Sequence, residues 1–143
     1  MLKTVQTRST WTGGMRVDAQ AREHNVIIDQ PQDFGGSDAG ANPMEHFLFA
    51  LGSCLGTMAA IVAKQKRIEL RNFSIEIDGD YDVDYLMGKT KEGRAGFTEI
   101  RASVYIDADM TPEEKADFFS IVDSRCPVTG SILNDTSINF VVK

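Results

Sequence analysis

The chain has 143 residues, a formal net charge of -6 and a sequence pI near 4.8. This length predicts one domain, residues 1–143, with a sizeable hydrophobic core. The acidic balance and the scattered Lys and Arg residues argue against a nucleic-acid partner, which needs a basic face. Two cysteines fit neither a disulfide-dense secreted scaffold nor a zinc cluster, so we expect a reducing, cytoplasmic setting and no metal.

The N-terminal part predicts three strands. Residues 3–11 are polar and rich in β-branched side chains, which indicates an edge or partner-facing strand. Residues 12–14 (TGG) indicate a hairpin turn, and residues 15–22 alternate between apolar and polar, which is typical of a strand with one buried face. Residues 26–28 (VII) form a short third strand that ends before Pro31. No signal peptide is recognisable in this polar, alternating region.

A glycine-rich loop follows at residues 31–42 (PQDFGGSDAGAN). Glycines before a helix can cradle a phosphate, but this loop has no Lys or Arg. It also matches neither the P-loop nor the dinucleotide-binding spacing. We therefore expect a flexible connection.

Residues 42–66 predict a long helix. Asn42 is placed to cap it, and Pro43 suits its first position. No residue from 47 to 63 is charged, and the apolar positions recur on every side. A helix that is apolar all round is covered by other elements, so we expect a core helix.

A membrane span is the alternative for this helix. The uncharged run lies at the lower limit of what crosses a bilayer, and Gly52 with Gly56 forms a GxxxG pair. The rest of the chain, with its alternating strands and one amphipathic helix, is typical of a soluble domain. We therefore favour the core helix and expect no membrane partner.

The C-terminal half predicts a hairpin, two helices and a last strand. Residues 73–78 alternate clearly, residues 79–95 are a polar excursion, and residues 100–106 form the returning strand. Residues 111–114 (TPEE) combine a cap, a proline and a capping box at a helix start. The buried side of this helix is expected from Phe118, Phe119, Ile121 and Val122.

That helix should end near Arg125, and a short helix should begin after Cys126. Residues 138–142 alternate again and predict a final strand. The order of elements lacks a βαβ repeat, which indicates an α+β fold of antiparallel sheets packed on a long central buried helix.

The two cysteines are the candidate reactive groups. Cys54 lies in the apolar helix, where Gly52, Ser53 and Gly56 are expected to leave room beside its sulfur. Taken alone, such a cysteine is more often a small core residue with a raised pKa.

Cys126 is placed differently, because the following Pro127 suits the first position of a helix. A thiol at the N-cap is expected to have a lowered pKa, and Arg125 could add to that field. If the two thiols meet, they form a redox pair in which one attacks and the other resolves a sulfenic acid as a disulfide. The separation of 72 positions leaves their distance open.

Two segments resemble the OsmC/Ohr family of osmotically inducible and organic hydroperoxide resistance proteins. Residues 42–66 (NPMEHFLFALGSCLGTMAAIVAKQK) are similar to its NPxELLLAALGSC helix, and residues 126–133 (CPVTGSIL) are similar to its CPVxxxL motif. The GGSDAGANP loop at residues 35–43, the Gly-Phe pair at 96–97 and the strand order agree as well. The resemblance covers nearly the whole chain and implies an intertwined homodimer with an active site at each subunit interface.

The implied activity is a two-cysteine thiol peroxidase that acts on organic hydroperoxides in oxidative stress. Carried over, Cys54 is the peroxidatic thiol and Cys126 the resolving thiol. The resemblance implies an external dithiol reductant, lipoylated in some members, and no cofactor. An alkyl or aryl peroxide would suit the apolar residues expected around Cys54, namely Phe47, Leu51 and Met58.

The chain departs from the better-studied family members in the groups that activate the thiol. Those members have a glutamate directly after the proline of the helix start, where this chain has Met44. Glu45 lies nine residues before Cys54, which places it on the opposite helix face, so a cap or surface role is expected. The chain therefore looks closer to the general OsmC-like branch.

The activating arginine of the family also has no clear counterpart. Arg16 and Arg22 are the early candidates, and we favour Arg16 for its position after the first turn. The alternative is a solvated charge on a strand. His46, eight residues before Cys54, is a second candidate partner. Loss of one charged partner could lower the fraction of thiolate roughly tenfold. We therefore expect a working peroxidase that is slow or has a different thiol pKa.

Two other functions remain open at the level of sequence. Met44 in place of glutamate is compatible with a non-catalytic module of the same fold that binds a small apolar ligand. The thiols could instead serve disulfide exchange with a protein partner. The reactivity of the cysteines distinguishes these alternatives from peroxide reduction.

Overall fold

The computed structural model describes residues 1–143, which form two compact units, Met1–Phe49 and Ala50–Lys143. We describe each unit by itself. The elements are β1 (Arg8–Gly13), β2 (Arg16–Ala21), β3 (His24–Ile28), a 3-10 turn η1 (Gln32–Phe34), α1 (Pro43–Lys66), β4 (Asn72–Tyr81), α2 (Val83–Leu86), β5 (Phe97–Asp107), α3 (Pro112–Ser124) and α4 (Pro127–Leu133).

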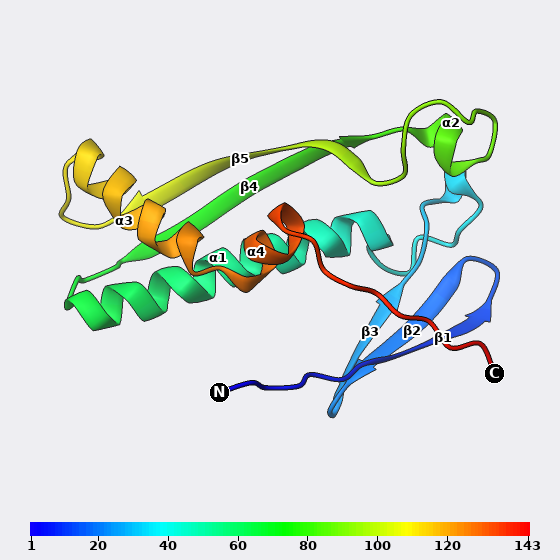
Figure 1. Ribbon diagram of the computed structural model, residues 1–143, viewed down its shortest axis with the longest axis horizontal. Helices are drawn as coiled ribbons and strands as arrows, with labels where there is room; N and C mark the ends of the chain where they lie inside the picture. Colours follow the sequence, from blue (N-terminus) through cyan, green and yellow to red (C-terminus); the bar gives the residue numbers. More distant parts are fainter. The chain divides into compact units, whose positions relative to one another are not determined.

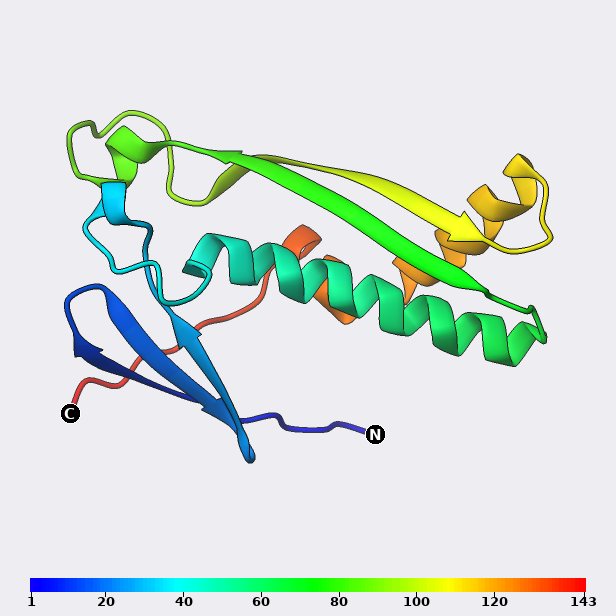
Figure 2. The same cartoon turned by 180° about the vertical axis from the view of Figure 1, so that it is seen from behind.

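The first unit contains an antiparallel sheet in the order β1-β2-β3 (Figure 2). The predicted hairpin and third strand are confirmed. β1 begins at Arg8, later than expected, and residues 1–7 are exposed without secondary structure. In β2 every side chain except the exposed Gln20 is half-buried, so the predicted contrast between a fully buried and a wet face is not found in this chain.

The glycine-rich loop is folded around one carboxylate. Asp29 is only 2% exposed. Its side chain accepts backbone N–H hydrogen bonds from Gln30 at 2.8 Å, Ser37 at 3.1 Å and Ala39 at 3.1 Å. The N–H groups of Ala39 and Gln30 lower the pKa of Asp29, and they outweigh the effect of burial, which raises it.

Two glycines in this loop lie where a side chain has no room. A Cβ on Gly36 would come within 1.8 Å of the carbonyl oxygen of Gln30, and one on Gly40 within 2.2 Å of that of Ile27. Composition suggested a flexible connection, but the loop is a closely packed one. Composition could not reveal that Asp29 is buried and accepts hydrogen bonds from the backbone N–H groups of the loop.

We predict that Asp29→Asn lowers the free energy of unfolding at pH 7, because an amide offers one acceptor oxygen where the carboxylate offers two. The folded-state pKa of Asp29 lies below the unfolded value of about 3.9, so this stabilisation is present above about pH 4 and is lost as the pH falls through the folded-state pKa. Urea unfolding at pH 7 and pH 3 should show that the difference between wild type and variant shrinks in acid. A difference that is equal at both pH values would contradict this role.

α1 begins and ends at recognisable caps. The backbone N–H of Glu45 donates to the side chain of Asn42 at 2.9 Å, and the N–H of Asn42 donates to the carboxylate of Glu45 at 2.7 Å. This reciprocal capping box confirms the expected cap role of both residues. At the other end Arg67 takes a left-handed conformation with φ 57°, and the N–H of Ile68 closes the helix on the carbonyl of Ala63 at 2.9 Å.

The helix predicted over residues 42–66 is confirmed, but only one of its faces is buried within this chain. That face consists of Leu51, Leu55, Ala59, Val62 and Ala63. The opposite face, with Ser53, Thr57, Ala60 and Ile61, is exposed, so coverage on every side is not found here. By length and composition α1 could also cross a membrane, although core helices of soluble proteins pass the same test.

The buried face of α1 packs against the antiparallel β4–β5 hairpin, which runs alongside the helix in Figure 1. The apolar side chains of β4 alternate inward as predicted. A Cβ on Gly52 would lie 3.3 Å from Cδ1 of Ile77, and one on Gly56 would lie 3.7 Å from Cδ1 of Phe73. These glycines therefore make room for β4, and not for the sulfur of Cys54 as expected, because a step of two residues turns a helix by about 200°.

The C-terminal helices match the prediction and the last strand does not. A capping box between Thr111 and Glu114 starts α3, Arg125 caps its end, and Cys126 is the N-cap of α4. Residues 135–143 have no secondary structure, and their apolar side chains are exposed. The predicted strand over 138–142 is wrong for this chain because no neighbouring strand hydrogen-bonds to it.

We predict that alanine at Gly56 of α1 and alanine at Gly79 of β4 change the free energy of unfolding in opposite directions. Gly56→Ala should raise the free energy of unfolding by roughly 0.5–1 kcal/mol, because alanine favours the helix and the added methyl has ordinary contacts. Gly79→Ala should lower it by about 1–3 kcal/mol, because its Cβ would lie 2.7 Å from Cδ1 of Phe97. Denaturant unfolding measures both; destabilisation by Gly56→Ala would contradict the packing described.

Candidate active site

The two cysteine sulfurs meet in the second unit. Sγ of Cys54 on α1 and Sγ of Cys126 at the start of α4 lie 3.0 Å apart, although 72 positions separate them in the chain. Both cysteines are free thiols in this structure. A disulfide needs an S–S distance of about 2.05 Å, so bond formation would require a shift of about one ångström.

Packing of the helices brings the sulfurs together. Phe118 and Val122 of α3 belong to the same buried cluster as Leu51 and Leu55 of α1. α3 ends at Ser124, and only two residues separate it from α4, so the chain turns over α1 where the thiol of Cys126 begins the next helix. Cys126 is 3% exposed, and Cys54 is partly buried beside the cluster.

Arg125 fixes this turn. Its Nη1 donates to Oε1 of Gln65 in the last turn of α1 at 2.8 Å. The guanidinium therefore bonds to the end of α1, and no arginine of residues 50–143 hydrogen-bonds to either sulfur. The guanidinium of Arg125, which was expected to act on Cys126, instead links the start of α4 to the end of α1.

Hydrogen bonds from α4 stabilise a negative charge on Cys126. The backbone N–H of Thr129 donates to its Sγ at 3.4 Å, which confirms the sulfur as the helix cap. Burial raises the pKa of Cys126, but the hydrogen bonds from Thr129 and from Cys54 outweigh it, and the pKa lies below its ordinary value. For Cys54, burial and the neighbouring Cys126 raise the pKa above its ordinary value.

Thr129 is the residue that sequence reasoning missed. Its hydroxyl is buried and forms no hydrogen bond in this structure. The Thr129 side chain nevertheless lies close enough to Cys126 to lower the pKa of that thiol. A signal was present in the sequence, because the N-cap side chain usually accepts from the third helical residue, which in CPVT is the threonine.

The other predicted site residues have separate partners. Arg16 on β2 forms an ion pair with Asp18 on the same strand, with Nε 2.7 Å from Oδ1. Its hydrogen bond lowers the pKa of Asp18. The ring of His46 packs edge-on against Phe49 with centroids 5.5 Å apart, and its buried Nε2 has no hydrogen-bond partner. Support of Cys54 by Arg16 or His46 stays a prediction.

The expected apolar surroundings of Cys54 are present in part. Leu51 is buried in the core cluster, and Met58 packs against it together with Cys54. Phe47 lies in the first unit and is 43% exposed. No three His, Cys, Asp or Glu side chains are grouped so that they could hold a metal ion.

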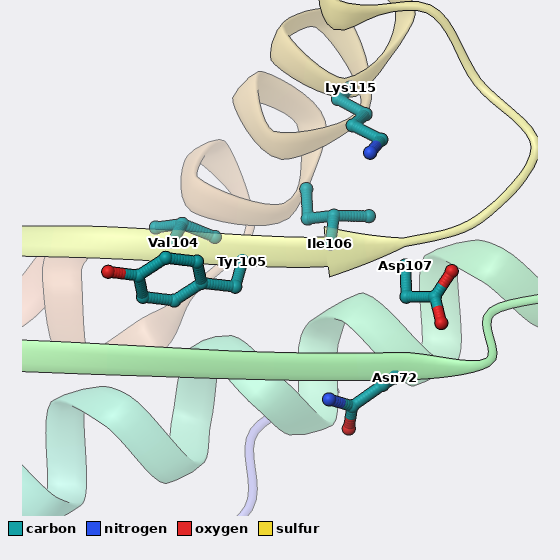
Figure 3. Close-up of a pocket in the computed structure, with 6 residues that line it drawn as sticks. All are labelled: Asn72, Val104, Tyr105, Ile106, Asp107 and Lys115. Atoms are coloured by element: carbon teal, nitrogen blue, oxygen red, sulfur yellow. The ribbon is translucent and has the colours of Figure 1, made fainter.

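A separate shallow pocket of about 330 Å³ lies where the ends of β4 and β5 face α3 (Figure 3). Lys115 of α3 extends toward Ile106, while Asp107 and Asn72 point away from it at the strand ends. None of the six lining residues is a cysteine or histidine. The pair of thiols is therefore the better candidate for chemistry.

Comparison with known proteins places this chain in one family. The sequence model described as OsmC-like protein matches residues 35–141. The chain therefore belongs to the OsmC-like protein family. A comparison with curated protein sequences gives no significant match.

Solved structures share the fold at low sequence identity. An OsmC-like protein from Mycoplasma pneumoniae is 19% identical with a TM-score of 0.81, over 93% of this chain and 89% of that one. An organic hydroperoxide resistance protein OsmC from Legionella pneumophila is 18% identical with a TM-score of 0.66, over 92% and 90%. An organic hydroperoxide resistance protein from Elizabethkingia anophelis is 18% identical with a TM-score of 0.67, over 92% and 89%.

Proposed function

We propose that this protein is a thiol-dependent peroxidase that reduces organic hydroperoxides through Cys54 and Cys126. The observation that supports it most is the 3.0 Å separation of the two sulfurs. Oxidation of either one leaves the other within reach, so a sulfenic acid is resolved before it can oxidise further. The names of the Legionella and Elizabethkingia neighbours agree with this substrate class.

The reaction takes two steps at the sulfurs. Cys54 attacks the distal oxygen of the hydroperoxide ROOH, the O–O bond breaks, and the alcohol ROH leaves while Cys54 becomes a sulfenic acid. Cys126 then attacks the sulfur of Cys54, an S–S bond forms, and the hydroxyl group leaves as water. In sum, two thiols and ROOH give one disulfide, ROH and water.

A dithiol reductant closes the cycle in this proposal. Its first thiolate attacks the disulfide, and its second thiol releases the mixed disulfide as a cyclic product. Cys54 is the more accessible sulfur, because Cys126 is 3% exposed, so attack is expected there. A lipoylated protein in a reducing, cytoplasmic compartment would supply such a dithiol.

The proposal includes a homodimer. The exposed face of α1 carries small and apolar side chains, including Ala60 and Ile61. The C-terminal segment exposes Ile138 at 72% and Phe140 at 86%. A second copy of the chain that covered these surfaces would bury apolar area that one chain leaves in water.

We predict that the wild-type protein consumes cumene hydroperoxide with a dithiol such as dihydrolipoamide, and that Cys54→Ser reduces this to the rate of the reductant alone. Cys126→Ser should abolish dithiol-supported turnover, because Cys54 then has no internal partner. Ser53→Ala is the matched control and should retain activity, since its hydroxyl donates only to the carbonyl of Ala50. Peroxide loss is followed in a coupled or dye-based assay.

A wild-type rate no better than that of free cysteine would refute the peroxidase. Binding of a small apolar ligand without thiol reactivity would then favour the non-catalytic module. Exchange with a model disulfide in the absence of peroxide would favour a protein disulfide as substrate.

A further inference from the structure

We infer that Cys126 holds the negative charge of the reduced pair and takes the proton of Cys54 as that sulfur attacks, so that Cys126 is the base of the reaction as well as its resolving thiol. This inference rests on the proposed peroxidase function and assigns a further role within the same site. It also makes Thr129 a positioning residue that acts through Cys126.

Three observations place the charge on Cys126. Its sulfur lies 3.0 Å from that of Cys54, within reach of a shared proton. The N–H of Thr129 donates to Cys126. The hydroxyl of Thr129 is buried, has no hydrogen-bond partner and lowers the pKa of Cys126, so a thiolate at Cys126 would offer an acceptor to a donor that is otherwise unpaired.

The pKa directions agree with this geometry. The pKa of Cys126 is lowered, against the effect of burial, by hydrogen bonds from Thr129 and Cys54. The pKa of Cys54 is raised by burial and by Cys126. The N–H of Val128 lowers both, so the first turn of α4 favours one negative charge on the pair and Thr129 directs it to Cys126.

No side-chain cation supplies this stabilisation within the second unit. Apart from the two thiols, no titratable side chain is among the groups that set either pKa. The neighbouring Arg125 donates to Gln65. Within the second unit, the groups that stabilise a negative charge on the pair are therefore backbone N–H groups and one hydroxyl.

Access separates the two roles. Cys126 is 3% exposed, so a hydroperoxide reaches the partly exposed Cys54 first. Cys54 holds the proton at rest and is a weak nucleophile until it passes that proton across 3.0 Å to Cys126. The thiolate of Cys126 is thus buried away from solvent, and the partly exposed Cys54 loses its proton only as it attacks the hydroperoxide.

The steps balance with one proton on the pair. The Cys54 proton moves to Cys126, and the Cys54 thiolate attacks ROOH to give ROH and a deprotonated sulfenic acid. The proton then returns from Cys126, so that the sulfenic acid becomes neutral and Cys126 is again a thiolate. Cys126 attacks Cys54, the disulfide forms, and hydroxide leaves. Peroxide is the oxidant, and the pair loses two electrons.

Thiolate absorbance near 240 nm, titrated against pH on the reduced protein without peroxide, locates the charge. We expect one thiolate in the wild type well below the ordinary thiol pKa of about 8.5, and the second well above it. Cys126→Ser should remove the low-pH step, while Cys54→Ala should keep it at a somewhat higher pH. A low-pH step that survives in Cys126→Ser and disappears in Cys54→Ala would overturn the inference.

Thr129 provides a second test with a matched control. Thr129→Val removes the hydroxyl but keeps the N–H, so the low-pH step should move to higher pH. Thr129→Ser restores the hydroxyl and should restore the wild-type titration. An unchanged titration in Thr129→Val would contradict the positioning role, and this readout would not respond to a purely structural change that leaves the thiols intact.

Single-turnover kinetics distinguish a base from a simple resolving thiol. Sulfenic acid formed on Cys54 is trapped with dimedone after mixing with cumene hydroperoxide at pH 7. We expect Cys126→Ser to slow this first step at least tenfold, because a positioned base that takes the proton typically contributes about 10²-fold or more. An equal first-step rate would overturn the base role. The titrations need no peroxide, so failure of the proposed peroxidase would be seen separately.

Discussion

The contact between the sulfurs of Cys54 and Cys126 is the feature on which the proposed chemistry depends. It joins two segments that are far apart in the chain, and no covalent bond holds it in the reduced protein. Packing of α3 on α1 holds it instead, through apolar side chains such as Val122 and Leu55. Because a disulfide needs a shift of only about one ångström, the core itself presets the reaction distance.

In our inference, backbone N–H groups stabilise the negative charge on the reduced pair of thiols. Residue 44, directly after the helix-starting proline, is methionine, and Arg125 is bonded to Gln65. Within the second unit, the N–H of Thr129 donates to the sulfur of Cys126, and Thr129 lowers the pKa of that thiol. An N–H group of a helix has a fixed direction, and a hydrogen bond to the charged form of one thiol favours the charge on that sulfur over the other.

Much of the fold could be predicted from the sequence because its signals are local. The caps at Asn42, Thr111 and Cys126 and the alternation in β4 depend on residues a few positions apart, and all were confirmed. The distance between the thiols could not be predicted, since it is set by packing between remote helices. The alternation at residues 138–142 indicated a strand, but pairing needs a neighbour that this chain does not provide.

Disulfide mapping after one equivalent of cumene hydroperoxide tests the central claim most directly. The reduced protein is oxidised under native conditions, blocked with an alkylating agent, digested and examined by mass spectrometry. The account predicts one linked peptide pair, Cys54 with Cys126 from the same chain, and no dimer on a non-reducing gel. Sulfinic or sulfonic acid on Cys54 with Cys126 still free, or a disulfide between two chains, would contradict it.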